Sequence, residues 1–398
     1  MRGMVPAAGP ALRRVTGPCL VKAKRKAYDA KAARTPTVRK IRPAIAAARR
    51  RPTETPRRPV ITAAPAGPDD GSSFDALGGR PVDLEVDLGS GLVLGNPVIV
   101  AAGPFGYGVE MADLLDLPRL GGLVTRGTSL KPRGGHPAPR MAEVPAGLLL
   151  GMGVPNPGLD LVLERYSTTW ALWPIPVILN LCGDSTADLT EAARRVEGVP
   201  GVAGIEVNLS CSGGGRGSAF GLDASSASNA ISAVRRACDL PLIAKLTAAA
   251  GDIRAVARAV EEAGADAISA INTLPGLAVT ADRRGPVLGS GYGGVCGPAL
   301  KPVALRVVYE VSQVVDVPVI GIGGVSTLDD VLDLLAVGAS AVGVGVAALA
   351  DPMLPVRLAD ELADACRARG LVSARELVGT ALPSRPSPSS TRGAEYAR

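Results

Sequence analysis

The hydrophobic positions of the chain form short runs that alternate with helical stretches from residue 98 to residue 368. Nearly continuous apolar runs of about five residues are typical of parallel strands that are buried on both faces. The pattern predicts strands at 98–102, 122–126, 176–181, 203–208, 241–246, 266–271, 318–322 and 340–344. Eight such units predict an α/β protein with a single (β/α)8 TIM barrel. A doubly wound sheet is disfavoured, because its Gly-rich fingerprint would follow the first strand and the Gly-rich turns here come late.

Helices are expected between these strands, and several begin with residues that commonly cap a helix. The expected ranges are 109–117, 157–172, 185–197, 223–238, 252–263, 298–315, 327–337 and 352–368. The candidate N-caps are Asp184 or Ser185, Asp223, Ser326 and Asp351. The barrel is therefore expected to occupy residues 79–375.

The two ends of the chain carry no sustained helical or strand period. Residues 1–78 are rich in Arg, Pro and Ala, and residues 376–398 are largely polar. Such segments bury too little apolar surface to offset the entropy of ordering, so both are expected to be disordered. The basic segment is either an arm for nucleic acid or anionic lipid, or an extension without function that arises from a start codon set too far upstream. The second interpretation is favoured, and nucleic acid is not an expected partner.

The positive net charge is confined to this leader. Of the total of +6, residues 1–58 carry +15, from 17 Lys or Arg against two acids, which leaves −9 on the remainder. No apolar stretch approaches the roughly 20 residues that span a bilayer, and no signal-peptide core lies near the start. We expect a cytoplasmic protein that does not associate with membranes.

Residue types that bind metals are scarce. The six cysteines have no CxxC spacing, which argues against a zinc site and against an iron–sulfur cluster held by this chain alone. The single histidine, His136, lies in the loop GGHPAPR, which argues against multi-histidine metal sites and Ser-His-Asp chemistry. We expect no metal, and a proton-transfer group other than histidine.

Polar residues end four consecutive predicted strands. Asn180, Asn208, Lys245 and Asn272 follow the apolar runs of PVILN, GIEVN, PLIAK and AISAIN. The carboxyl ends of barrel strands form the active-site face of this fold. These side chains are therefore predicted to line one site.

Lys245 has two interpretations. A buried ammonium is costly unless it meets negative charge. It fits a flavin, whose pyrimidine edge gains negative charge on reduction, and it also fits a pair with a barrel carboxylate. The asparagines supply paired donors and acceptors that suit the edge of a flavin ring or a cyclic amide.

Two Gly-rich turns follow the last two predicted strands, at 321–325 and 343–347. A β/α barrel often binds a phosphate at this place on backbone N–H groups. The pair of turns predicts a phosphate-bearing cofactor.

Cys211 lies in the Gly-rich loop 208–221, directly after a strand-end asparagine. A thiolate there would act as a general base if its pKa fell towards neutrality beside Lys or Arg. The alternative is a small buried apolar residue, but the position on a loop that could close over a site favours function. Cys296 is expected to pack at the start of the following helix.

From about residue 84 to 350 the chain resembles the class 1 dihydroorotate dehydrogenases, most closely the NAD-linked 1B group. The stretches that carry the resemblance are NPVIVAAGPFGYG (96–108), PRMAEVPAG (139–147), NPG (156–158), NLSC (208–211), AGADAISAINTL (263–274), GGVCGPALKPVALRVVYEVSQ (293–313) and PVIGIGGVSTLDDVL (318–332). The resemblance implies an FMN-dependent barrel. A Cys rather than a Ser at position 211 is typical of class 1 rather than of the membrane-associated class.

The resemblance also implies roles for individual residues. Cys211 would be the base that takes the C5 proton of dihydroorotate, while hydride leaves C6 for the flavin. Residues implied to contact the FMN ring and ribityl chain are Ala102, Gly103, Asn180, Asn208, Lys245, Ile271 and Gly297. Those implied to hold its phosphate are Gly323, Gly324, Gly345 and Val346. Those implied to bind substrate are Arg126, Asn208, Asn272 and Thr273.

The sequence departs from the family pattern on the substrate side. Arg126 replaces a lysine, Leu150 replaces an asparagine, and Ser212 and Gly213 stand where Pro and Asn are expected; a KLSPN-like stretch is reduced to KLTAA (245–249). Each unmatched hydrogen-bonding partner costs roughly 1–3 kcal/mol. Two losses correspond to about two to four orders of magnitude in affinity unless other groups compensate. The cofactor half is nearly intact and the substrate half is altered, which leaves a changed substrate open.

Three functions follow from this comparison. The first is FMN-dependent oxidation of (S)-dihydroorotate to orotate in de novo pyrimidine (UMP) biosynthesis, with a partner subunit that carries FAD and a [2Fe–2S] cluster in a homo- or hetero-oligomer. The alternative is the same mechanism on another cyclic amide or enone, as in dihydropyrimidine dehydrogenase. The third, non-enzymatic, is a flavin-binding interaction protein; the presence of Cys211 and Lys245 argues against it.

Overall fold

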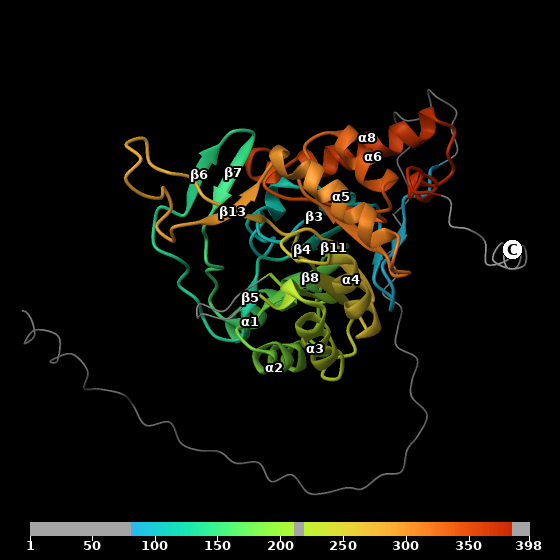
Figure 1. The fold of residues 1–398 in the computed structure, drawn as a ribbon. Helices are drawn as coiled ribbons and strands as arrows, with labels where there is room; N and C mark the ends of the chain where they lie inside the picture. Colours follow the sequence, from blue (N-terminus) through green and yellow to red (C-terminus); the bar gives the residue numbers. More distant parts are fainter. Residues whose placement is uncertain (1–80, 211–218, 384–398) are drawn as a thin grey trace, which may run out of the picture. The chain divides into compact units, whose positions relative to one another are not determined.

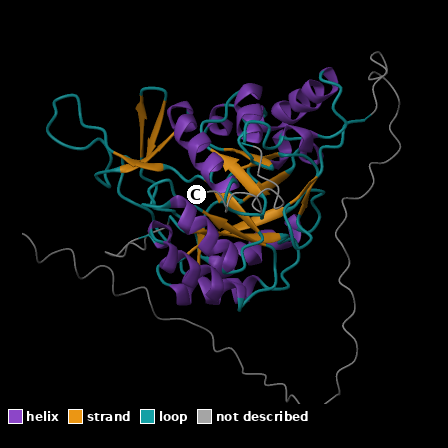
Figure 2. Cartoon of the chain, turned by 45° about the vertical axis from the view of Figure 1, so that its right-hand side comes forward, coloured by secondary structure: helices purple, strands orange, loops and turns teal. Residues whose placement is uncertain are grey.

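The computed structural model describes residues 81–210 and 219–383. The predicted extension (1–78) lies outside these residues, as does most of the predicted tail. In the described part, eight parallel strands close into a barrel with helices around it (Figures 1 and 2). This confirms the predicted (β/α)8 fold.

The barrel strands follow chain order around the closed sheet. Each pairs with the next, and the last pairs back with the first at Val342 and Val98. The short strand β5 (Thr128–Ser129) pairs with the carboxyl-terminal end of β8. The barrel strands are β3 (Val98–Val100), β4 (Gly122–Val124), β8 (Val177–Cys182), β9 (Gly204–Asn208), β10 (Leu242–Lys245), β11 (Ala267–Ala270), β14 (Val319–Ile322) and β15 (Ala341–Val344).

Seven of the eight expected helices are present in the described residues, but the first is wrong. The segment expected as a helix at 109–117 forms two 3-10 turns, η2 (Ala112–Leu114) and η3 (Leu117–Arg119). The break lies at Leu115 and Asp116, whose backbone is not helical, and Pro118 lies in the first turn of η3, where its missing N–H leaves no helix bond unmade. The helices are α1 (Leu159–Trp170), α2 (Thr186–Val196), α3 (Ala224–Arg235), α4 (Ile253–Glu262), α5 (Lys301–Ser312), α6 (Leu328–Ala336), short α7 (Ala347–Ala350) and α8 (Leu354–Ala368); further 3-10 turns are η4 (Phe220–Leu222), η5 (Pro298–Leu300) and η6 (Ala374–Leu377).

Two of the predicted N-caps are confirmed and two are wrong. Ser185 accepts a hydrogen bond from the Asp188 backbone N–H, and Asp223 accepts one from that of Ser226. Helix α6 is capped by Thr327 rather than Ser326, and α8 begins after Met353 rather than at Asp351. The first error shifts the helix start by one residue between two adjacent hydroxyl residues. The second shifts it by two residues, and Asp351 still accepts a hydrogen bond from the Met353 N–H just before the helix.

A short hairpin closes the amino-terminal end of the barrel. It consists of β1 (Val86–Asp87) and β2 (Val93–Leu94), which pair antiparallel. Leu88, Leu92 and Leu94 are buried and pack against inward side chains of the barrel strands, among them Ile178 and Ile320. The interior is therefore apolar at this end, and the opposite end carries the strand-end polar residues.

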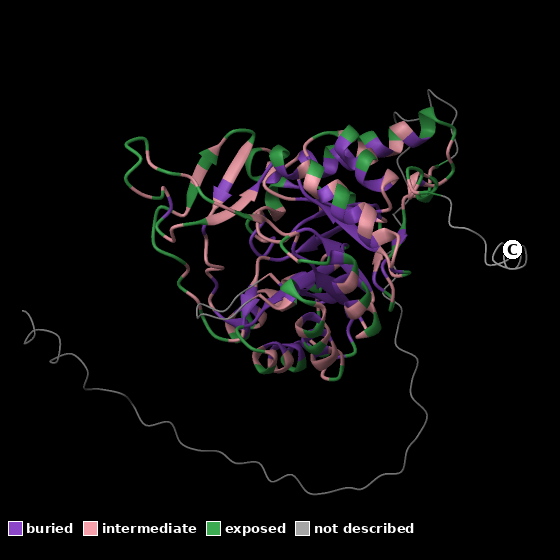
Figure 3. Ribbon diagram, viewed as in Figure 1, coloured by how far each residue is buried: buried purple, intermediate pink, exposed green. Residues whose placement is uncertain are grey.

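A four-stranded antiparallel sheet, which the sequence did not predict, stands beside the barrel (Figure 1). Its order is β12 (Leu274–Gly276), β13 (Gly293–Cys296), β7 (Gly147–Leu150) and β6 (Met141–Val144). Met141 on this sheet, and Leu277, Val279 and Tyr292 in the loop that joins β12 to β13, each expose half or more of their surface. Figure 3 shows this region largely exposed or half-buried beside the buried barrel strands.

The first and last described segments lie together at the amino-terminal end of the barrel. Asp83 forms a parallel bridge with Ser373: its N–H donates to the Val372 carbonyl, and its carbonyl accepts from the Ala374 N–H. The chain then stays in contact with the barrel, since Gly379 and Ala381 donate to the carbonyls of Leu335 and Ala336. Ordered structure thus continues beyond residue 375, where the tail was expected to begin. No helix among the described residues is both long and apolar enough to cross a bilayer.

Candidate active site

The four polar residues predicted to share a site do lie together at the carboxyl ends of β8 to β11. Lys245 on β10 is paired in register with Asn208 on one side and Ser269 on the other. Asn272 donates from Nδ2 to the Oδ1 of Asn208 at 3.1 Å. These strands form one continuous polar wall of the barrel mouth.

The sequence reasoning missed the residue at the centre of this wall, Glu206. It has no exposed surface, and its carboxylate accepts from Asn180 Nδ2 at 2.5 Å, Lys245 Nζ at 3.3 Å and Ser269 Oγ at 2.6 Å. The available signal was a single charged residue inside the apolar run GIEVN, two positions before Asn208 and hence on the same side of the strand.

The structure confirms the second interpretation of Lys245, which is that it pairs with a carboxylate of the barrel. The lysine side chain is about 5% exposed and the glutamate side chain is fully buried. This pair does not exclude a cofactor contact, because an ammonium carries three donors and Glu206 accepts one of them.

Hydrogen bonds fix the orientation of the mouth asparagines. A carboxylate only accepts, so Asn180 turns its Nδ2 to Glu206 and its Oδ1 to the Cys182 thiol at 3.5 Å. Asn208 donates from Nδ2 to Cys182 Sγ at 3.6 Å, which leaves its Oδ1 to accept from Asn272. Cys182 thus links the two asparagines, a contact that the sequence reasoning did not predict.

The two Gly-rich turns differ in the space around their backbone. Gly323 and Gly324 have φ values of 141° and 77°, and a Cβ at either would lie 2.7 Å from the Cβ of Ala304 or Lys301. In contrast, a Cβ at Gly345 or Gly103 would have no atom within 4 Å. Crowding behind the first turn and free space at the second fit a bound phosphate on the backbone N–H groups.

The remaining predicted cofactor residues line the same end of the barrel. Ala102 lies two residues after the end of β3, and Ile271 is buried after β11, where the Ala270–Ile271 peptide bond is cis. Gly297 has a φ of 96° and passes so close to Gly147 that a Cβ would lie 2.8 Å from its Cα. Val346 precedes the short helix α7.

On the predicted substrate side, Leu150 and Thr273 share a surface of the protruding sheet. Leu150 pairs directly with Gly294, so their side-chain positions point to the same face. A Cβ at Gly294 would clash with the Thr273 hydroxyl. An apolar side chain therefore lies beside a predicted substrate contact.

Arg126 follows β4 and donates its backbone N–H to the Gly106 carbonyl at 2.7 Å. Its charge acts on Tyr107: burial raises the pKa of that phenol, and the Thr128 hydroxyl and the Arg126 charge oppose the rise.

The predicted base, Cys211, lies outside the described residues together with Ser212 and Gly213. Cys296 is buried at the end of β13, just before the 3-10 turn that begins α5, and its thiol donates to the Leu148 carbonyl. Burial raises its pKa, which suits the packing role expected for it.

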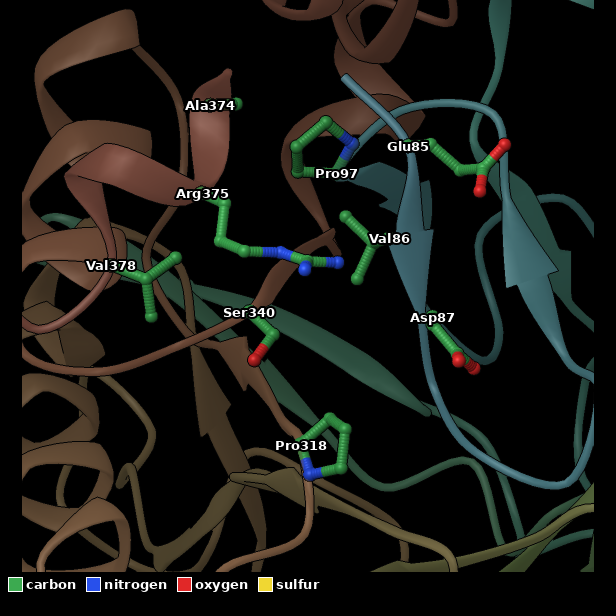
Figure 4. A pocket seen from close by; sticks show the side chains of 9 residues that line it. All are labelled: Glu85, Val86, Asp87, Pro97, Pro318, Ser340, Ala374, Arg375 and Val378. Carbon is green, nitrogen blue, oxygen red and sulfur yellow. The ribbon is translucent and has the colours of Figure 1, made fainter. Parts of the chain in front are cut away.

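A pocket of about 220 Å³ lies at the opposite end of the barrel (Figure 4). None of the predicted site residues lines it; the residues that do are Glu85, Val86, Asp87, Pro97, Pro318, Ser340, Ala374, Arg375 and Val378. Arg375 extends across it towards Val86 (Figure 4). We assign it no part in the site at the mouth.

The fold and the mouth are those of a β/α barrel with a polar site at the carboxyl ends of its strands. The chain belongs to the dihydroorotate dehydrogenase family, whose model matches residues 84–366. It is 42% identical over 302 residues to the "Dihydroorotate dehydrogenase B (NAD(+)), catalytic subunit" of Geotalea uraniireducens, covering 76% of this chain and 98% of that protein. Proteins of the same name from Pelobacter propionicus and Porphyromonas gingivalis are 43% and 40% identical, each over 75% of this chain and 98% of its relative. Family membership confirms the predicted class, an FMN-dependent oxidoreductase that acts on CH–CH donors.

Proposed function

We propose that this protein oxidises (S)-dihydroorotate to orotate in pyrimidine biosynthesis, as the catalytic subunit of an NAD-linked enzyme. The observation that carries the proposal is the polar wall of β8 to β11 facing the Gly-rich turns after β14 and β15. It occurs in a chain whose barrel is about 42% identical to relatives named for this activity.

FMN, when bound, would supply the acceptor for the hydride that leaves C6 of the substrate. Lys245 and the mouth asparagines would hold its polar edge, and the Gly-rich turns would hold its phosphate through backbone N–H groups. The cofactor set is the one implied by the resemblance: Ala102, Gly103, Asn180, Asn208, Lys245, Ile271, Gly297, Gly323, Gly324, Gly345 and Val346.

Cys211 takes the proton from C5 of the substrate, which converts the C5–C6 bond to a double bond as the hydride leaves. Asn208, Asn272 and Thr273 hydrogen-bond the ring of the substrate. Arg126 pairs with its carboxylate, although a guanidinium is bulkier than an ammonium and differs in geometry.

A second candidate is the same mechanism on another cyclic amide or enone. It is favoured by one observation: Leu150 presents an apolar side chain beside Thr273, where an amide would be needed to bond a polar ring. A less polar substrate would suit this surface.

We also propose a partner. The relatives are named as catalytic subunits of an NAD-dependent enzyme, and electrons would pass to a second subunit with FAD and a [2Fe–2S] cluster. The exposed apolar side chains of the protruding sheet and its β12–β13 loop support an assembly that covers them. The complex is proposed to be cytoplasmic, with residues 79–375 as the catalytic barrel and the two ends as appendages.

The test is anaerobic mixing of the FMN-loaded protein with dihydroorotate, followed by flavin absorbance near 450 nm. We expect rapid bleaching, and we expect Cys211→Ala to stay yellow but to lose bleaching by substrate. A wild type that dithionite bleaches and dihydroorotate does not would transfer the proposal to the second candidate. Equal bleaching by Cys211→Ala would remove Cys211 as the base.

A further inference from the structure

Glu206 is a fully buried carboxylate to which the proposed reaction gives no role. It lies two residues before Asn208 on β9, so both side chains face the barrel interior. Side chains from three neighbouring strands donate to it: Asn180 on β8, Lys245 on β10 and Ser269 on β11. The polar wall is thus organised around this one carboxylate.

Stability alone does not account for a carboxylate at this place. Burying an ion pair costs desolvation that the mutual attraction recovers only with good geometry and further hydrogen bonds. Apolar residues of similar volume often hold a fold as well or better. In the same barrel, the interior nearer the amino-terminal ends of the strands is filled by apolar side chains instead, among them Ile178, Ile243 and Ile320.

Two of the three donors belong to residues that are proposed to bind FMN. The carboxylate fixes which end of the Asn180 amide faces the mouth, because only Nδ2 can donate to it. The carboxylate also accepts a hydrogen bond from the Lys245 ammonium on the side away from the mouth. Its negative charge partly cancels the positive charge of the ammonium. At such short separation inside a protein, that offset is large compared with the same pair in water.

We propose that Glu206 is a positioning residue for the FMN site. It sets the placement of Lys245 and Asn180, and it keeps the midpoint potential of the bound flavin below the value that Lys245 alone would give. The inference rests on the FMN site of the proposed function, but not on the identity of the substrate.

The test is the midpoint potential of FMN bound to Glu206→Gln, measured by dithionite titration against a reference dye without any substrate. Gln keeps the shape of the side chain and removes its charge. We expect at least a tenfold rise in the ratio of reduced to oxidised flavin at a fixed potential, which is about 30 mV for two electrons. The double variant Glu206→Gln, Lys245→Gln removes both charges, and its midpoint potential is expected to lie within about 30 mV of the wild-type value. An unshifted potential in Glu206→Gln would overturn the inference.

The matched control is Asp266→Asn, which breaks another ion pair of the barrel. Asp266 pairs with Arg235 at the amino-terminal ends of the strands, away from the mouth. This variant is expected to lose stability while the potential and the Kd for FMN stay unchanged. An equal shift of the potential in this control would show a general effect of weakened folding, which would also overturn the inference.

A second variant covers failure of Glu206→Gln to fold. Glu206→Asp keeps the charge and retracts the carboxylate by one methylene, so the Kd for FMN is expected to rise at least tenfold. An unchanged Kd would contradict the positioning role. A wild type that takes up no FMN would overturn the proposed function together with this inference, whereas a yellow wild type with unshifted variants would overturn the inference alone.

Discussion

At the residue scale, the side chains of the mouth are held mainly by one another. Asn272 bonds Asn208, Asn208 bonds Cys182, and Cys182 bonds Asn180. Each amide therefore has a defined orientation before any ligand binds. Such preorganisation lowers the ordering cost of binding.

Leu150 provides a prediction at this scale. Because it lies beside Thr273, Leu150→Asn would place an amide next to the proposed substrate ring. If the substrate is dihydroorotate, one new hydrogen bond of about 1 kcal/mol should lower KM several-fold, as measured by initial rates of flavin-linked turnover. Leu148→Asn, on the same face of β7 two residues earlier, is the control and should leave KM unchanged. A KM that rises in Leu150→Asn alone would favour the less polar substrate.

The strand-end residues were predictable because each one interrupts an apolar run at the point where a strand must end. Glu206 was not, because a charged residue within such a run was counted as part of the strand. The partners that make its burial tolerable lie 26 to 63 positions away in sequence. Only the closed sheet brings them together.

At the element scale, helix α6 has an acid-sensitive start. Asp330 accepts from the Ser326 and Thr327 backbone N–H groups and from Lys301. Burial alone would raise its pKa, but these bonds outweigh burial and hold the pKa at about 2, below its usual 3.8. A lowered folded-state pKa means that the stabilisation is present above pH 4 and is lost as the pH falls towards 2.

We therefore expect Asp330→Asn to reduce the free energy of unfolding by about 1–2 kcal/mol at pH 7. The difference from wild type should shrink between pH 4 and pH 2, as followed by urea denaturation across that range. Asp329→Asn, which changes the exposed neighbouring carboxylate, serves as the control and should show a smaller effect. A difference between Asp330→Asn and wild type that stays constant down to pH 2 would contradict the assignment.

The hairpin β1–β2 provides a prediction about the floor of the barrel. Leu94 is fully buried against the inward side chains, so Leu94→Ala should cost about 2–5 kcal/mol of unfolding free energy. The mouth lies at the other end, so the Kd for FMN of the folded protein should not change. Val93→Ala, at a half-buried position of the same strand, should cost less. A weakened Kd in folded Leu94→Ala would show that the floor and the mouth are coupled.

Elements with a strong period were predicted well and elements without one were not. The barrel strands are runs of buried apolar residues, and most helices between them carry a clear apolar face. The protruding sheet joins a hairpin at residues 141–150 to β13 through the pairing of β7 with residues 294–296, and its short strands are mostly half-buried or exposed. No local pattern marks the pairing of β7 with β13, since barrel strands separate the two in sequence.

At the scale of the whole molecule, the described residues form their own core. Removal of residues 1–78 is therefore expected to leave the Tm and the Kd for FMN unchanged, as measured by thermal denaturation and flavin fluorescence. Neither the full chain nor the shortened one should retain DNA at physiological salt. Salt-sensitive DNA retention by the full chain that is lost on shortening would instead support a basic arm.

The bridge between Asp83 and Ser373 has a mechanical consequence. A force applied to the described chain at residues 82 and 375 would load the hydrogen bonds that join Asp83 to the residues on either side of Ser373 before any barrel strand. Because the two segments run parallel, these bonds would bear the force together in shear, and the hairpin floor would follow once they break. The strands that carry Asn180, Asn208 and Lys245 lie in the middle of the chain, so the mouth would be the last part of the barrel to bear tension.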